Sequence, residues 1–100
     1  MIKHIVLWKL KDEAQGNTKA TNAHLAKEKL EALGGKIPGL LKIEAGIDFN
    51  QSAAAYDVAL YSELESRAAL AAYQSHPEHV AVKEFIQGIV AERCVVDYEL

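Results

Sequence analysis

The sequence predicts an α+β fold in which strands and helices follow one another in the order β-α-β-β-α-β. Two observations support this order. Several short segments are rich in β-branched residues, and their apolar residues either alternate with polar ones or form a continuous run, as in β-strands. In two longer segments the apolar residues recur every three or four positions, as in amphipathic helices. The chain has 100 residues, half of them apolar and a quarter charged, as expected for one globular domain with one core.

We expect the first strand over residues 2–10, which are too few and too β-branched for a helix. Val6 and Trp8 on its even-numbered side, and Ile5 and Leu7 on the other side, make both faces apolar at the centre. A strand with two apolar faces lies inside a sheet and is covered on both sides.

A helix is expected over residues 18–33, after a polar loop at 12–17, and Gly34-Gly35 end it. One face of this helix is apolar and carries Ala23, Ala26, Leu30 and Leu33. His24 lies in the middle of the helix beside lysines and is expected to be solvated.

Residues 37–48 alternate between apolar and polar, which predicts a half-exposed strand at an edge of the sheet. Its apolar face is expected to contain Leu41, Ile43, Ala45 and Ile47. Residues 56–64 predict a third strand and residues 89–100 the last one. Cys94 lies in the apolar run of that last strand and is expected to be a small buried residue.

The second helical segment begins after Ser66, whose side chain can cap it. It must break at His76-Pro77, because proline lacks the N–H donor and clashes with the preceding turn. Pro77 suits the first position of a new helix, which we expect to run to about Gln87, with Gly88 after it.

The predicted order is that of the ferredoxin-like fold, in which the first and third strands are central and both helices pack on one face of an antiparallel sheet. The other face stays open and carries apolar side chains from several strands. A contiguous apolar face is a partner site, and packing two such sheets face to face about a two-fold axis covers it most simply. We therefore expect a homodimer.

Composition argues against several classes of function. The net charge of −3 offers no basic surface, so nucleic acid is not an expected partner. Residues 1–10 are apolar but short, contain charged side chains and lack a cleavage site, so we expect neither a signal peptide nor a membrane span. A single cysteine allows no internal disulfide and no zinc pattern is present, so the cytoplasm is the expected compartment.

The stretch YQSHPEH at residues 73–79 combines a phenol with two imidazoles and predicts a small acid/base site. The imidazole of His79 can take up a proton near neutral pH, and the hydroxyl of Tyr73 can donate a hydrogen bond to a developing oxyanion. Proton abstraction next to a carbonyl needs these two functions and no metal or cofactor. His4 and Trp8 share a strand face, and if that face meets the helices, His4 and His79 reach the same interior layer.

The same residues allow a purely structural interpretation. Tyr73 could be a core residue with its hydroxyl at the rim, and His76 could cap the helix that starts at Pro77. His79 could line a pocket without catalysing a reaction. Asp97 could orient an imidazole, or it could be a charge at the strand edge.

Five segments, taken in their order and spacing, resemble the stress-responsive dimeric α/β-barrel (Dabb) family: IKHIVLWKLKDE, IPGL, YDVALYSELES, YQSHPEHV and VVDYE. The resemblance spans nearly the whole chain and implies a ferredoxin-like protomer that forms a dimeric barrel. It also implies an apolar pocket for a small hydrophobic or carbonyl compound. The family includes a plant polyketide cyclase, olivetolic acid cyclase, and many members without an assigned activity.

The resemblance implies site residues as well. The family pattern Y-x-x-H-P-x-H implies catalytic roles for Tyr73 and His79. The pocket is expected to be lined by His4, Trp8, His76 and Asp97. Magnesium bound at the dimer contact in plant relatives implies backbone carbonyl ligands here at Gly34, Ile37 and Leu40. Three functions stay open: a binding or stress-protective protein, a cofactor-free lyase or cyclase, and a cofactor-independent monooxygenase.

Overall fold

A four-stranded antiparallel sheet forms the frame of the molecule, with the strand order β4-β5-β1-β6. The computed structural model describes all residues, 1–100. Its elements are β1 (Ile2–Leu10), β2 (Glu13–Ala14), β3 (Asn17–Thr18), α1 (Lys19–Glu31), β4 (Leu40–Ile47), β5 (Val58–Leu64), α2 (Arg67–Ser75), α3 (Pro77–Gln87) and β6 (Val90–Glu99). β1 and β5 are central, which confirms the predicted ferredoxin-like topology.

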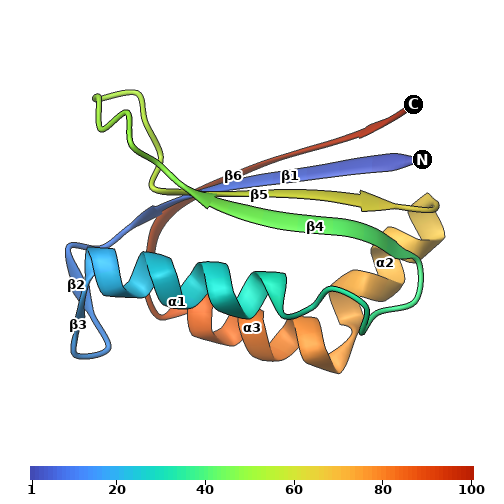
Figure 1. The fold of residues 1–100 in the computed structure, drawn as a ribbon, viewed down its shortest axis with the longest axis horizontal. Helices are drawn as coiled ribbons and strands as arrows, with labels where there is room; N and C mark the ends of the chain where they lie inside the picture. Colours follow the sequence, from blue (N-terminus) through green and yellow to red (C-terminus); the bar gives the residue numbers. More distant parts are fainter.

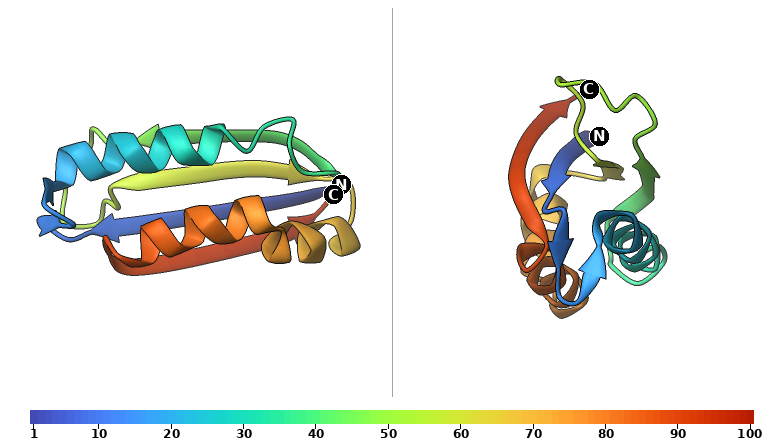
Figure 2. Two further views of the ribbon diagram at one scale, coloured as in Figure 1. Left: turned by 90° about the horizontal axis from the view of Figure 1, so that it is seen from below. Right: turned by 90° about the vertical axis from the view of Figure 1, so that its left-hand side faces the viewer.

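All three helices lie on one side of the sheet (Figure 1). Seen from the helical side, α1 runs along β4 and β5, and α3 runs along β1 and β6 (Figure 2). Between these layers lies the core, to which β1 contributes its even-numbered side chains, every one of them buried. The opposite side of β1 is only half-buried, because no helix covers it. No helix is both long enough and apolar enough to span a membrane.

The predicted boundaries of α2 and α3 are confirmed, whereas α1 ends at Glu31, two residues earlier than predicted. The hydroxyl of Ser66 caps α2 by accepting the N–H of Ala69 at 3.1 Å. His76 has extended backbone angles, φ −65° and ψ 134°, and separates α2 from α3. Pro77 then starts α3 and Gly88 follows its end, while His24 is exposed on α1 as expected.

The segment 12–17, predicted to be a loop, instead contains the hairpin of β2 and β3. Gln15 and Gly16 form its two-residue turn with φ of 56° and 77°, the left-handed pair that such tight hairpins require. The amide of Asn22, buried on α1, donates a hydrogen bond to the Ala14 carbonyl at 3.0 Å and holds the hairpin against the helix. The prediction failed because Gln15 is an uncommon residue for the first turn position.

The predicted apolar face of residues 37–48 needs a correction at both ends, because Leu41 and Ile47 are exposed. The pairing of β4 with β5 shifts between Leu40 and Lys42, so that Leu40 lies opposite the buried Leu64. Leu41, predicted to be on the core side, is the extra residue of this bulge and is 51% exposed. Ala45 is buried as predicted.

Cys94 is exposed, contrary to the prediction that it is buried. It lies opposite Leu7, on the face of the sheet that the helices leave open, and it belongs to the edge strand β6. Val96, two residues further along β6, is also exposed at 56%. A run of apolar residues marks a buried strand only where a second layer covers it, and within the protomer no such layer exists.

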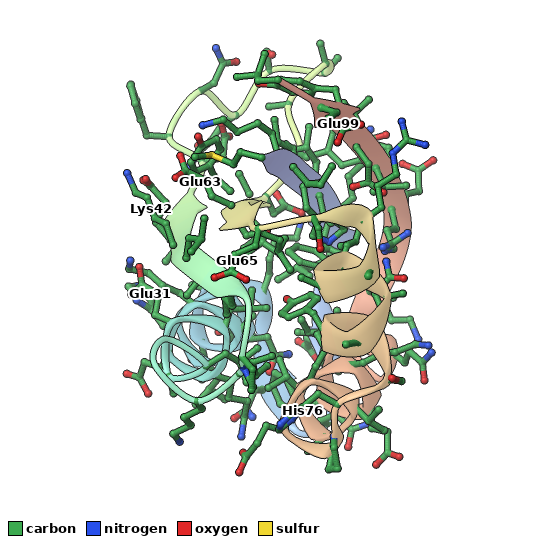
Figure 3. All side chains as sticks on the ribbon, turned by 90° about the vertical axis from the view of Figure 1, so that its right-hand side faces the viewer. Glu31, Lys42, Glu63, Glu65, His76 and Glu99 are labelled. Carbon is green, nitrogen blue, oxygen red and sulfur yellow. The ribbon has the colours of Figure 1, made fainter.

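The open face also carries a polar cluster. Lys3 donates hydrogen bonds to the Tyr61 hydroxyl at 2.5 Å and to the Glu63 carboxylate at 2.7 Å, and Tyr61 donates to the same carboxylate at 2.5 Å. Figure 3 shows Glu63 and the neighbouring Lys42 on the side of the sheet away from the helices. The face is therefore apolar at its centre, with a fixed set of charges towards one end.

Candidate functional site

A cavity of about 480 Å³ lies between the helices and the sheet. Buried side chains from β1, α1 and α3 form its floor, among them Val6, Trp8, Leu30, Val82 and Ile86. Its rim consists of exposed polar side chains, namely Gln74, Lys83, Gln87 and Arg93. An apolar floor with a few convergent polar groups is the usual composition of a small-molecule site. His4 and His79 are the two imidazoles in the wall.

The helix break explains how His79 reaches this cavity. His76 ends α2, and its Nδ1 accepts the N–H of Glu78 at 3.1 Å, which caps α3. Figure 3 shows His76 at the junction of the two helices. After this break α3 begins anew, and His79, Val82 and Ile86 share the face that points towards the sheet. The expectation that His76 lines the pocket is wrong, because its ring caps α3 and does not reach the cavity.

The surroundings of His79 define which of its nitrogens carries the proton. Its Nδ1 lies 3.2 Å from the carbonyl oxygen of Gln74, which can only accept, so Nδ1 is the protonated nitrogen of the neutral ring. Burial lowers the pKa of His79 below its ordinary value of 6.5, with smaller contributions in the same direction from His4, Lys83 and Arg93. The ring is therefore neutral at pH 7, with Nε2 free to accept a proton.

The second imidazole, His4, is held by a carboxylate. Its Nδ1 lies 2.5 Å from Oδ1 of Asp97, its direct cross-strand partner on β6. The side chain of His4 is 3% exposed and that of Asp97 is 39% exposed, so the pair runs from the interior to the edge of the sheet. Asp97 therefore orients an imidazole, and Nε2 of His4 makes no hydrogen bond within the protein.

Tyr73 occupies the space between the two imidazoles. Its ring centroid lies 4.4 Å from that of His79 and 6.0 Å from that of His4. The residue is fully buried, and its hydroxyl has no hydrogen-bond partner. Burial raises the pKa of Tyr73 to about 12, so the phenol stays protonated. The interpretation of Tyr73 as a core residue is confirmed, but its hydroxyl is buried and does not lie at the rim.

The structure brings most of the predicted site residues together. His4, Trp8 and His79 line the cavity, Tyr73 packs behind the histidines, and Asp97 reaches the cavity only through His4. The cavity is not lined by the residues whose backbone carbonyls were predicted to bind magnesium, namely Gly34, Ile37 and Leu40. They lie where α1 connects to β4, and the Ile37 carbonyl accepts the Leu40 N–H at 3.2 Å. Magnesium binding by these carbonyls stays a prediction.

The sequence analysis did not predict the polar rim of the cavity. Lys83 and Gln87 follow His79 at intervals of four residues, which is the spacing of one helix face, so this signal was available. Arg93 gives no such signal, because its position depends on the pairing of β6 with β1, where it lies opposite Trp8. That register is a tertiary feature of the sheet.

Fold and cavity together define a ferredoxin-like domain with an interior site, and comparison with known proteins gives its family. The family model "Stress responsive A/B Barrel Domain" (Dabb) matches residues 2–100, and the chain belongs to this family. An uncharacterized protein of Streptomyces coelicolor is 33% identical over 96 residues, which cover 92% of this chain and 97% of that protein.

Two further relatives extend the comparison. A stress-response A/B barrel domain-containing protein of Arabidopsis thaliana is 37% identical over 100 residues, which cover 98% of this chain but only 36% of the plant protein. A crystal structure of a dimeric protein of unknown function with a ferredoxin-like fold, from Bacteroides fragilis, has a TM-score of 0.87 at 38% identity. That similarity covers 99% of this chain and 95% of the other.

Proposed function

We propose that this protein binds a small apolar carbonyl compound in the cavity between α3 and the sheet. The observation that supports the proposal is the composition of the wall, in which apolar floor residues surround the two imidazoles of His4 and His79. An apolar chain would lie over Trp8 and Val82. Tyr73 packs behind the imidazoles, so a carbonyl oxygen in the cavity supplies the acceptor that its buried hydroxyl lacks only when the rings of His4 and His79 move apart on binding.

Titration with 2-octanone tests this proposal through tryptophan fluorescence. Trp8 is the only tryptophan, is 6% exposed and lies in the cavity wall, so its emission reports on this cavity alone. We expect a saturable change in its intensity or wavelength. A solvent-exposed emission spectrum, or one that 2-octanone leaves unchanged up to its solubility limit, would contradict the proposal.

A catalytic role in the same cavity is the second candidate, and the fixed tautomer of His79 favours it. In the proposed step, Nε2 of His79 takes a proton from the carbon next to the carbonyl. The electron pair of the broken C–H bond moves to the carbonyl oxygen and forms an enolate, to which Tyr73 donates a hydrogen bond. Return of the proton from His79 to the opposite face of that carbon completes an epimerisation. Attack of the enolate carbon on a second carbonyl of the same molecule, whose oxygen then takes the proton from His79, completes a cofactor-free cyclisation.

We further propose that the protein is a homodimer in which two open sheet faces pack together. Two observations support this proposal. The centre of that face is apolar, and the Bacteroides fragilis relative is described as a dimeric protein. We expect light scattering to give the mass of a dimer at micromolar concentration, since an obligate interface of this kind buries roughly 2,000 Å² or more.

Variants of the open face make the dimer test specific. Val96→Lys should give a monomer, because it places a charge on the exposed centre of the open face. His24→Lys, on the exposed side of α1, should leave the dimer intact. A well-folded monomeric wild type at micromolar concentration would refute the dimer.

A further inference from the structure

The opening of the cavity is positively charged. Its exposed rim contains Lys83 from α3 and Arg93 from β6, whereas the buried floor contains no lysine, arginine, aspartate or glutamate. Both cations lie near enough to His79 to lower its pKa through charge repulsion. Lys83 in the helical layer and Arg93 in the sheet therefore both lie near the part of the cavity that contains His79.

No carboxylate balances these two cations. None of the residues that line the cavity is an aspartate or a glutamate, although the chain has 14 acidic and 11 basic residues. Most Lys and Arg side chains elsewhere are ion-paired, namely Lys3, Lys9, Lys19, Lys27, Lys42 and Arg67. Lys83 and Arg93 make neither ion pairs nor side-chain hydrogen bonds. Asp97, on the same face of β6 as Arg93, is bonded to His4.

A local excess of positive charge at the mouth of an apolar cavity attracts an anionic group and holds it at the rim. An isolated surface pair contributes little, but here two unpaired cations act on one group beside a low-dielectric floor. Gln74 and Gln87, also at the rim, can donate hydrogen bonds to the same group.

We propose that the ligand is an apolar carbonyl compound with a terminal anionic group, which Lys83 and Arg93 bind at the rim while the carbonyl end enters the floor. This inference rests on the proposed carbonyl-binding function and specifies its ligand class. The ligand is thus amphipathic, in the manner of a medium-chain keto acid.

Matched probes separate the charge from the apolar chain. 7-Oxooctanoate and its primary amide have the same ketone and the same chain as 2-octanone, and they differ from each other in the terminal charge. Affinities of both are measured by Trp8 fluorescence at low salt and again at high salt. We expect the carboxylate to bind roughly tenfold more tightly than the amide at low salt, and this preference to shrink as salt screens the rim.

Charge-removing variants assign the preference to the rim. In the double variant Lys83→Gln/Arg93→Gln the carboxylate should bind no more tightly than the amide, and the affinity for the amide should stay as in the wild type. Lys36→Gln is the matched control, because Lys36 is exposed, makes no ion pair and lies outside the cavity lining. This control should keep the preference.

The possible outcomes distinguish the two proposals. Equal binding of carboxylate and amide to the wild type, with 2-octanone also bound, overturns the anionic ligand but leaves the carbonyl-binding cavity standing. A preference that persists in the double variant also overturns the role of the rim. Failure of all three probes to change the emission of Trp8 contradicts the proposed function and, with it, this inference.

Discussion

Replacement of His79 by alanine is expected to reduce turnover of an enolisable carbonyl substrate by about 10²–10⁴-fold, the usual contribution of a positioned general base. The fold should persist, because His79 is only half-buried and its one hydrogen bond goes to the backbone of Gln74. Since burial lowers the pKa of His79, the wild-type rate should fall on acidification only below pH 6.5, the ordinary value for an imidazole. Protonation of Nε2 removes the base.

Two other histidines provide the controls for this variant. His76→Ala should retain turnover but lose roughly 1 kcal/mol of stability, because it removes the cap of α3. His24→Ala, on the exposed side of α1, should change neither quantity. If His79→Ala leaves the rate unchanged with a substrate that the wild type converts, the catalytic candidate is wrong and the cavity is a binding site alone.

Replacement of Tyr73 by phenylalanine is expected to stabilise the fold and to impair catalysis at the same time. The hydroxyl of Tyr73 is buried without a partner, and such a group carries a desolvation cost of about 1–3 kcal/mol. Its removal should raise the free energy of unfolding by roughly 1 kcal/mol. Turnover should fall by about 10²–10³-fold, because the enolate loses its hydrogen-bond donor.

Tyr61→Phe is the matched control for this prediction. The Tyr61 hydroxyl has partners in Lys3 and Glu63, so its removal should destabilise the protein and leave the cavity unaffected. Chemical denaturation and activity measured on both variants give the comparison. A loss of stability in Tyr73→Phe would mean that the hydroxyl is a structural group with a partner, and not one reserved for a ligand.

Local patterns in the sequence predicted the fold well, because the determining interactions are local. The two apolar faces of residues 2–10 predicted a central strand, and Ser66 and Pro77 predicted the starts of the two helices. The alternation of Ile2 to Leu10 also predicted that His4 and Trp8 share one face of the strand, but not whether that face meets the helices. The structure shows that the helices cover the even-numbered face, which brings His4 and His79 to one layer.

The remaining features depend on pairing between distant segments. The exposure of Cys94 follows from its place on an edge strand, and that of Leu41 follows from a bulge against β5. The unpaired hydroxyl of Tyr73 depends on how two helices and a strand meet. The position of Arg93 at the rim depends on the register of β6. None of these pairings leaves a periodic signal in the sequence.

The central claim is that the ligand binds between α3 and the sheet, and residue-resolved NMR during the 2-octanone titration tests it most directly. The protein has a second hollow, of about 520 Å³, on the open face beside Leu7, Phe49 and Tyr56, so the two locations can be told apart. We predict saturable shifts of the Trp8 indole and of the amides of His79 and Val82. Shifts confined to Leu7, Phe49 and Tyr56 would place the ligand on the open face and contradict the claim.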